Sequence, residues 1–259
     1  MTAAVPTALA PALVAPVAEL LLAMADDEAI LGWTDSEWTG IAPLLEEDVA
    51  MSSLSQDELG HAAALYDLLA GLIGGDRDAL AYDRAPADYR HARLLDHGRG
   101  DWAMTIARRF LYESADAVRL EALVAGSWAP LAELARAIAR EERYHRMHVD
   151  TWFERLARAE GEPRERLLAA LAILAPDAAT VLAPLDGEAA LVSAGILAAP
   201  LGELEARWRA LVEPVLRRLD LPVPAARAAA RGRTEHGPAF LALHDAFTSV
   251  RHADPGATW

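Results

Sequence analysis

The chain has 259 residues, of which 53% are hydrophobic, and a formal net charge of −15. That length and apolar content allow a large buried core, and the absence of cysteine excludes disulfides and iron–sulfur clusters. Electrons for any redox reaction would therefore have to come from another protein.

Charge and hydropathy exclude two further classes of protein. No Lys or Arg precedes Arg77, whereas thirteen acidic residues do, which argues against nucleic-acid binding. A basic partner surface or a solvated acidic face would explain this charge on the first helix pair. No segment reaches the roughly 20 uninterrupted apolar residues of a membrane span. Pro11 and Pro16 interrupt the apolar segment 7–24 and no basic residue precedes it, so we expect no signal peptide and a cytoplasmic protein.

The composition favours helices, because Ala, Leu, Arg and Glu dominate and aromatic residues make up only 6%. Helical spacing of apolar residues predicts helices over 12–38 and 43–73, then a long connection over 74–100. Two more helices are predicted over 101–125, with Asp101 as N-cap, and over 130–159. We expect no strand of credible length.

Later helical segments over 163–175, 201–219 and 234–250 are expected to pack on this bundle rather than form a second domain. The sequence thus predicts an all-α, ferritin-like four-helix bundle over 12–159, with additional C-terminal helices over 163–250 in a single domain 1–259.

Two Glu-x-x-His motifs stand out, Glu58 with His61 and Glu142 with His145. Residues three apart on a helix share one face, so each pair has the spacing to bind one ion. Di-iron and di-manganese bundles use two such pairs and one glutamate from each of two other helices. The motifs therefore predict two more glutamates at the same level of the bundle.

Glu28 and Glu113 meet this requirement, because they precede Glu58 and Glu142 by 30 and 29 residues. Turn signals at 40–43 and 126–130 lie near the midpoint of each interval. A helical segment of about 15 residues rises roughly 22 Å. If the chain runs about 15 residues to a turn and about 15 back, the two glutamates of each interval lie at the same level. The predicted metal ligands are Glu28, Glu58, His61, Glu113, Glu142 and His145.

Oxygen and nitrogen ligands without thiolates suit two iron ions, with manganese as the alternative. Glu58 and Glu142 are expected to bridge the ions, and Glu28 and Glu113 to bind as terminal or bridging carboxylates. Each residue also has another interpretation. Glu28 follows two acids and would then be solvated, and Glu141 competes with Glu142 because it is one turn from His145.

Other polar residues receive weaker interpretations. We expect His91 and His97 to be solvated loop residues. His148 and Asp150 would either contact the metal ligands from outside or be exposed at the surface. Glu235 and His236 are interpreted as helix-start residues. Arg227, Arg231 and Arg233 would form a solvated basic loop or hold phosphates. Trp38 and Trp128, at matching positions near the two turns, are expected to pack.

Several segments resemble the C-type subunit family of the bacterial phenylacetyl-CoA epoxidase. They are Ser36-Glu37-Trp38-Thr39-Gly40-Ile41-Ala42-Pro43, the following segment 45–50, segment 101–108, Arg143-Tyr144-His145, Thr234-Glu235-His236-Gly237 and Pro255-Gly256-Ala257-Thr258-Trp259. The resemblance covers about residues 20–259 and implies a ferritin-like fold. It also implies a multicomponent monooxygenase in which a catalytic A-type subunit, a structural C-type subunit and a flavin and iron–sulfur reductase act on phenylacetyl-CoA.

This chain departs from the C-type pattern, because Gln56-Asp57-Glu58-Leu59-Gly60-His61 and Glu141-Glu142-Arg143-Tyr144-His145 resemble the motifs of the catalytic subunit. We therefore expect a di-iron monooxygenase component acting on an aromatic acyl-CoA. Its catalytic carboxylates would be Glu28, Glu58, Glu113 and Glu142.

Its partners would be other oxygenase subunits and a separate reductase, with a homodimer as a further option. One alternative is a non-catalytic structural subunit. Another is an iron-oxidising or peroxide-consuming protein that works without a reductase.

Overall fold

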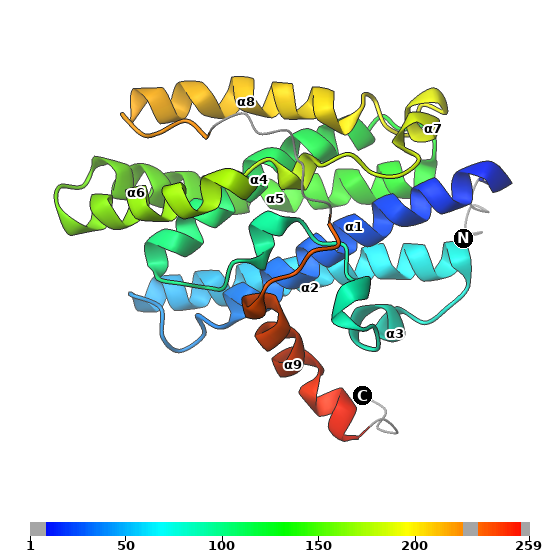
Figure 1. Ribbon diagram of the computed structural model, residues 1–259, viewed down its shortest axis with the longest axis horizontal. Helices are drawn as coiled ribbons and strands as arrows, with labels where there is room; N and C mark the ends of the chain where they lie inside the picture. Colours follow the sequence, from blue (N-terminus) through cyan, green and yellow to red (C-terminus); the bar gives the residue numbers. More distant parts are fainter. Residues whose placement is uncertain (1–8, 225–232, 255–259) are drawn as a thin grey trace.

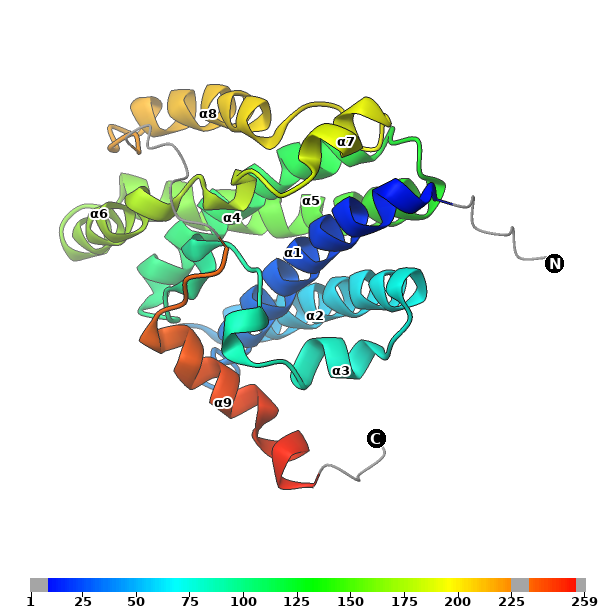
Figure 2. The ribbon, with the colours of Figure 1, turned by 45° about the vertical axis from the view of Figure 1, so that its right-hand side comes forward.

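The computed structural model describes residues 9–224 and 233–254, and within these two ranges the chain forms helices and no strand. Helix α1 (Pro11–Ser36) packs along α2 (Leu45–Ile73), and α4 (Trp102–Leu123) packs along α5 (Ala129–Arg158). The two antiparallel pairs lie against each other with α2 beside α5 (Figures 1 and 2). This is the ferritin-like bundle that the sequence predicted.

Local signals explain where these four helices begin and end. Pro11 stands in the first turn of α1, and α2 stops at Gly74, whose φ of 73° suits glycine. The Asp101 carboxylate accepts the Met104 amide at 2.9 Å and caps α4 as predicted. All eight ends lie within about two residues of the predicted positions.

The connection between the two pairs is ordered by short helices. It contains α3 (Arg77–Tyr82) and the 3₁₀ turns η1 (Pro86–Asp88) and η2 (Arg93–Asp96). The expectation of solvated histidines here was wrong, because His91 is fully buried and His97 is only a quarter exposed, with its Nε2 3.0 Å from Asp177. Both side chains are used to attach the connection to neighbouring segments.

The C-terminal third covers the bundle on the side of α4. Helix α6 (Glu162–Leu174) and α8 (Leu201–Arg218) pack on α4, while the short α7 (Glu188–Ser193) contacts α1. The 3₁₀ turns η3 (Ala175–Asp177) and η4 (Thr180–Leu182) join α6 to α7. Helix α4 is therefore enclosed on nearly every side.

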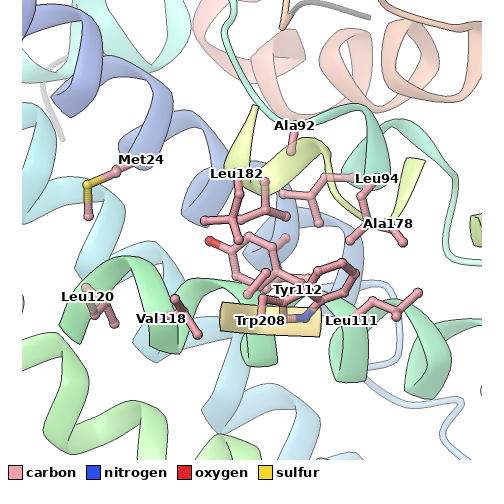
Figure 3. Packing of buried hydrophobic residues seen from close by; sticks show 14 of the residues in the cluster. Met24, Ala92, Leu94, Leu111, Tyr112, Val118, Leu120, Ala178, Leu182 and Trp208 are labelled. Carbon is pink, nitrogen blue, oxygen red and sulfur yellow. The ribbon is translucent and has the colours of Figure 1, made fainter. Parts of the chain in front are cut away.

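One hydrophobic cluster joins the bundle to these added helices. Figure 3 shows Leu111 and Tyr112 of α4 in this cluster together with Trp208 of α8. The indole Nε1 of Trp208 donates to Ser114 Oγ at 2.8 Å. Trp38 and Trp128 are also buried, as predicted. The single domain over 1–259 stays a prediction.

The last helix, α9 (Pro238–Ala253), begins four residues later than predicted and points away from the bundle (Figures 1 and 2). Asp96 accepts the amide of Gly237, and Arg93 donates to the Glu235 carbonyl at 3.0 Å. These bonds hold the backbone extended before Pro238. Glu235 and His236 therefore precede the helix and do not start it, which corrects that interpretation.

Among the described residues, no helix is both long and apolar enough to cross a membrane.

Candidate metal centre

The six predicted ligand residues are all buried where the four bundle helices face one another. None exposes more than 6% of its surface. They come from α1 (Glu28), α2 (Glu58 and His61), α4 (Glu113) and α5 (Glu142 and His145). The out-and-back geometry of each helix pair brings them to one level of the bundle.

Four of them converge most tightly. Glu28, Glu58, His61 and Glu142 each present one ligand atom within 4.8 Å of the others. The Nδ1 atom of His61 lies 3.4 Å from Glu28 Oε2, 3.6 Å from Glu58 Oε2 and 3.5 Å from Glu142 Oε1. Metal–ligand bonds of about 2.0–2.2 Å place neighbouring ligand atoms roughly 3–3.5 Å apart. These four side chains have the spacing of a coordination sphere.

His145 completes a second half beside the first. Its Nδ1 lies 3.1 Å from Glu142 Oε1 and 3.4 Å from Glu58 Oε1. Glu58 thus presents Oε2 towards His61 and Oε1 towards His145, and the two imidazole centroids are 6.1 Å apart. A carboxylate with one oxygen for each histidine is placed to bridge two ions.

Each histidine is held from outside by a carboxylate of the opposite helix. His61 Nε2 donates to Glu141 Oε2 at 2.8 Å, and His145 Nε2 donates to Asp57 Oδ2 at 3.2 Å. Metal-binding histidines commonly use one ring nitrogen this way, which turns the other towards the ion. Glu141 is therefore an outer partner and Glu142 the inner residue. The acid immediately before each motif glutamate was the sequence signal for this role.

Arg109 is the residue of the centre that the sequence analysis missed. It is fully buried, and each of its three nitrogens binds a different carboxylate. Nη2 donates to Glu58 Oε1 at 2.6 Å, Nε to Glu113 Oε1 at 2.8 Å and Nη1 to Asp35 Oδ2 at 2.7 Å. Glu113 thus joins the centre through Arg109. Its position one turn before Glu113 was the available signal.

Glu28 and its two acidic neighbours are buried, so the solvated interpretation of residues 26–28 was wrong. Tyr112 donates to Glu28 Oε1 at 2.8 Å. Asp27 pairs with Arg119 at 2.6 Å and with Arg233 at 2.8 Å. Arg233 is consequently neither solvated nor free to hold phosphates, and Arg227 and Arg231 lie outside the described residues.

Burial and neighbouring charges shift the pKa values of the carboxylates in different directions. Burial, reinforced by Glu58, raises the pKa of Glu28 well above its usual value, and burial raises the pKa of Glu113 to about 8. Burial and Glu58 likewise raise the pKa of Glu142. At Glu58 burial would raise the pKa, but the guanidinium of Arg109 and hydrogen bonds from His145 and His61 together outweigh burial and lower it. The centre therefore binds protons when no other cation is present.

The pKa values of the two histidines are raised, as expected for imidazoles beside carboxylates. Burial alone would lower both values, but Glu28 and Glu58 raise the pKa of His61 to about 12. Glu142 and Glu58 raise the pKa of His145 to about 11. Protons on these rings balance carboxylate charge that a metal ion would otherwise balance.

Several buried polar atoms of the centre have no hydrogen-bond partner within residues 9–224 and 233–254. They are Glu58 Oε2, Glu113 Oε2, Glu142 Oε1 and His145 Nδ1. Buried polar atoms are normally satisfied, and an unsatisfied group commonly marks a ligand or ion. Four such atoms in one centre, on oxygen and nitrogen donors without thiolates, fit a bound iron or manganese cluster.

A cavity of about 430 Å³ reaches the centre between α4 and α5. Glu113 and Glu142 line it together with apolar side chains such as Leu120. Arg143 and Arg146, which are less buried than these glutamates, line it as well. A small apolar molecule with an anionic group has the chemistry to enter here.

The other candidates are not at this centre. His148 Nε2 lies 2.7 Å from Glu47, and the Asp150 carboxylate lies 3.9 Å from Arg146. His91 and His236 stack at 4.3 Å and both approach Asp96 Oδ1, at 3.1 and 3.4 Å. This last cluster attaches the segment before α9 to the connection.

Comparison with known proteins agrees with the resemblance stated from the sequence. The family model described as phenylacetic acid catabolic protein matches residues 3–259. The C-type subunit of 1,2-phenylacetyl-CoA epoxidase from Escherichia coli (strain K12) is 28% identical over 245 residues, which cover 92% of this chain and 97% of that protein. The chain belongs to the family of phenylacetic acid catabolic proteins.

Proposed function

We propose that this chain is a metal-binding subunit of a multicomponent oxygenase of the phenylacetyl-CoA epoxidase type, and that its buried centre takes part in oxidising an aromatic acyl-CoA. The observation that carries the proposal is the convergence of two Glu-x-x-His pairs with their inner nitrogens facing Glu58 and Glu142. Outer carboxylates hold both histidines in that orientation. Membership of the family supports the role in phenylacetate catabolism.

The residues that would hold iron are Glu28, Glu58, His61, Glu113, Glu142 and His145, and manganese is the alternative ion. Bound there, the metal supplies the redox chemistry with oxygen, for which the chain has no cysteine-bound electron carrier of its own. A separate reductase would therefore deliver electrons. The chain itself buries these six residues and fixes Glu28 through Tyr112.

The cavity between α4 and α5 supports an acyl-CoA substrate. Its apolar wall, including Leu120, suits an aromatic ring, and it leads to Glu113 and Glu142. Arg143 and Arg146 provide cations of the kind that bind the phosphates of coenzyme A. The ring would reach the metal while the charged part of the substrate stays outside.

The second candidate function is a structural subunit that supports a catalytic partner. The specific observation in its favour is Arg109, which already binds two of the proposed ligands. The turn before α2 exposes Ile41, and the first turns of α2 expose Leu45 and Val49 beside the acids of residues 46–48. A basic partner subunit with an apolar contact surface would suit this region.

Metal analysis tests the leading proposal. Protein reconstituted with Fe²⁺ without oxygen should hold at least one iron per chain, and Glu142→Gln should lose most of it. Glu133→Gln, the same change at an exposed position of α5, is the control and should bind as the original does.

Activity of the assembled complex separates the two functions. Glu58→Ala should abolish turnover in the complex if the centre takes part in the reaction. Less than about one metal per chain, with a Glu58→Ala complex that remains fully active, would instead assign the structural role.

A further inference from the structure

The two halves of the proposed metal centre differ in their contact with Arg109. On the His61 side, Glu28 pairs with no arginine among the described residues, and Glu142, which faces both histidines, pairs with none there either. On the His145 side, Glu58 Oε1 accepts Arg109 Nη2 at 2.6 Å. The two positions are therefore unequal before any metal binds.

Arg109 lies where a second ion would bind its carboxylates. Its Nη2 and Nε atoms bind Glu58 Oε1 and Glu113 Oε1, and Glu58 Oε1 is the oxygen that faces His145 Nδ1 at 3.4 Å. The guanidinium and a metal ion are both cations, and both are attracted to these carboxylate oxygens. Both cannot occupy the same approach to them.

The guanidinium is held firmly in this place. Its third nitrogen binds Asp35 at 2.7 Å, and Asp35 also binds Arg108 at 2.7 Å. Arg109 itself is fully buried, and a guanidinium keeps its proton in proteins. Arg109 therefore stays charged and has no solvent to move into.

We propose that Arg109 occupies the second metal position, so that the chain binds one ion tightly on the His61 side and a second only weakly. The inference rests on the proposed metal-binding function. A second ion has to displace the guanidinium from Glu58 and Glu113, and breaking a buried charged pair is costly. This predicts that the second dissociation constant exceeds the first by about 100-fold or more.

Titration with Mn²⁺ followed by electron paramagnetic resonance tests the proposal without relying on enzymatic activity. The first equivalent should give the six-line spectrum of an isolated ion, and a spin-coupled pair should be absent until a large excess is added. In Arg109→Met the two constants should differ by less than about tenfold. The coupled spectrum should then form at two equivalents.

Arg108→Met is the matched control. Arg108 is equally buried on α4 and shares Asp35, but its contacts are with Asp35 and the carbonyls of His97 and Gly98 rather than with the centre. This variant should retain the unequal binding of the original protein. If it too bound two ions alike, general loosening of α4 would explain the result and the specific role of Arg109 would be overturned.

The remaining outcomes decide the inference separately from the proposed function. Two ions of similar affinity with a coupled spectrum in the original protein would overturn the inference and leave the metal centre intact. Binding of no ion by any of the proteins would overturn the metal-binding function and the inference together. Should Arg109→Met fail to fold, the titration of the original protein alone decides whether the two positions are unequal.

Discussion

At the scale of single residues, Asp57 and Glu141 explain how the two imidazole rings are aimed at the centre. Each accepts a hydrogen bond from the outer ring nitrogen of a histidine on the opposite helix. Without such a partner the ring is free to turn, and metal binding loses its oriented donor. We therefore expect the two acids to tune metal affinity, although neither is placed to bind an ion itself.

Replacing Asp57 by Asn should weaken metal binding about 10–100-fold, because the bond to His145 Nε2 loses its charge. Asp67→Asn is the control, since this exposed carboxylate of α2 pairs only with Arg77 at 3.4 Å among the described residues. Competition with a coloured chelator measures both. Equal affinities in the two variants would refute the orienting role.

Asp27 tests how much the buried ion pairs around the centre contribute to stability. Asp27→Ala leaves the buried Arg119 and Arg233 without this partner, which should cost about 3–5 kcal/mol in the free energy of unfolding. Asp78→Ala breaks only an exposed pair with Arg77 and should cost about 0–1 kcal/mol. Urea denaturation measures the free energy of unfolding of both variants. A loss of stability in Asp27→Ala no larger than in Asp78→Ala would show that the buried ion pairs of Asp27 do not stabilise the fold.

At the scale of helices, Gly32 sets the spacing between α1 and α2 at the level of the ligands. A Cβ at this position would meet Leu59 Cγ at 3.0 Å, and Glu58 Cβ and the Ser55 carbonyl at 3.1 Å. The close approach brings Glu28 and Glu58 to the same point of the centre, where we propose that an ion binds. A larger residue would push the two helices apart.

Gly32→Ala should therefore lower the free energy of unfolding by about 1–3 kcal/mol and weaken metal binding. Gly60→Ala, on α2 with no atom near the added Cβ, should instead be neutral or stabilise by up to about 1 kcal/mol. Thermal denaturation with and without metal compares them. Indistinguishable variants would show that the helices do not depend on this contact.

The attachment of α9 should depend on pH through Asp96. Burial would raise the pKa of this carboxyl, but bonds from His236, His91 and the Gly237 amide outweigh burial and lower it. A lowered pKa means that Asp96 stabilises the fold above its unfolded pKa of about 3.9 and loses this contribution as pH falls below it.

Hydrogen exchange in α9 should accelerate below about pH 4 more than in α4, after correction for the intrinsic pH dependence of exchange. Asp96→Asn should show faster α9 exchange already at neutral pH. If α9 were equally protected in the variant and the original protein, Asp96 would not be its anchor.

The main helices were predictable because apolar spacing and the Gly and Pro residues at their ends are local signals. The start of α9 was not, since Asp96 and Arg93 reach it from 141 and 142 residues away. The six candidate ligands followed from matched spacing along two helix pairs. The role of Arg109 and the burial of His91 could not be predicted. Each depends on which side of its segment is covered by helices that are distant in the sequence.

At the scale of the whole molecule, the centre lies in an unusually charged interior. Eight buried carboxylates surround it, at positions 26, 27, 28, 35, 58, 113, 116 and 142, and five arginines, at positions 84, 108, 109, 119 and 233, pair among them. Protons on the two histidines and one glutamate, or metal ions, would balance the remaining charge. A cation therefore has a thermodynamic reason to bind here.

Metal should consequently raise the melting temperature of the protein, because an ion that binds only the folded state stabilises it by mass action. At a free Mn²⁺ concentration about 100 times the dissociation constant, the gain should be about 2.7 kcal/mol. The Glu142→Gln variant should show a much smaller shift. A shift of equal size in both proteins would place the bound ion elsewhere.

Crystals grown with iron and measured at the iron absorption edge test the metal centre most directly. An anomalous peak is expected among Glu28, Glu58, His61 and Glu142, within bonding distance of His61 Nδ1. No peak at this position under saturating iron, or a peak only at the protein surface, would contradict a metal role for the buried centre.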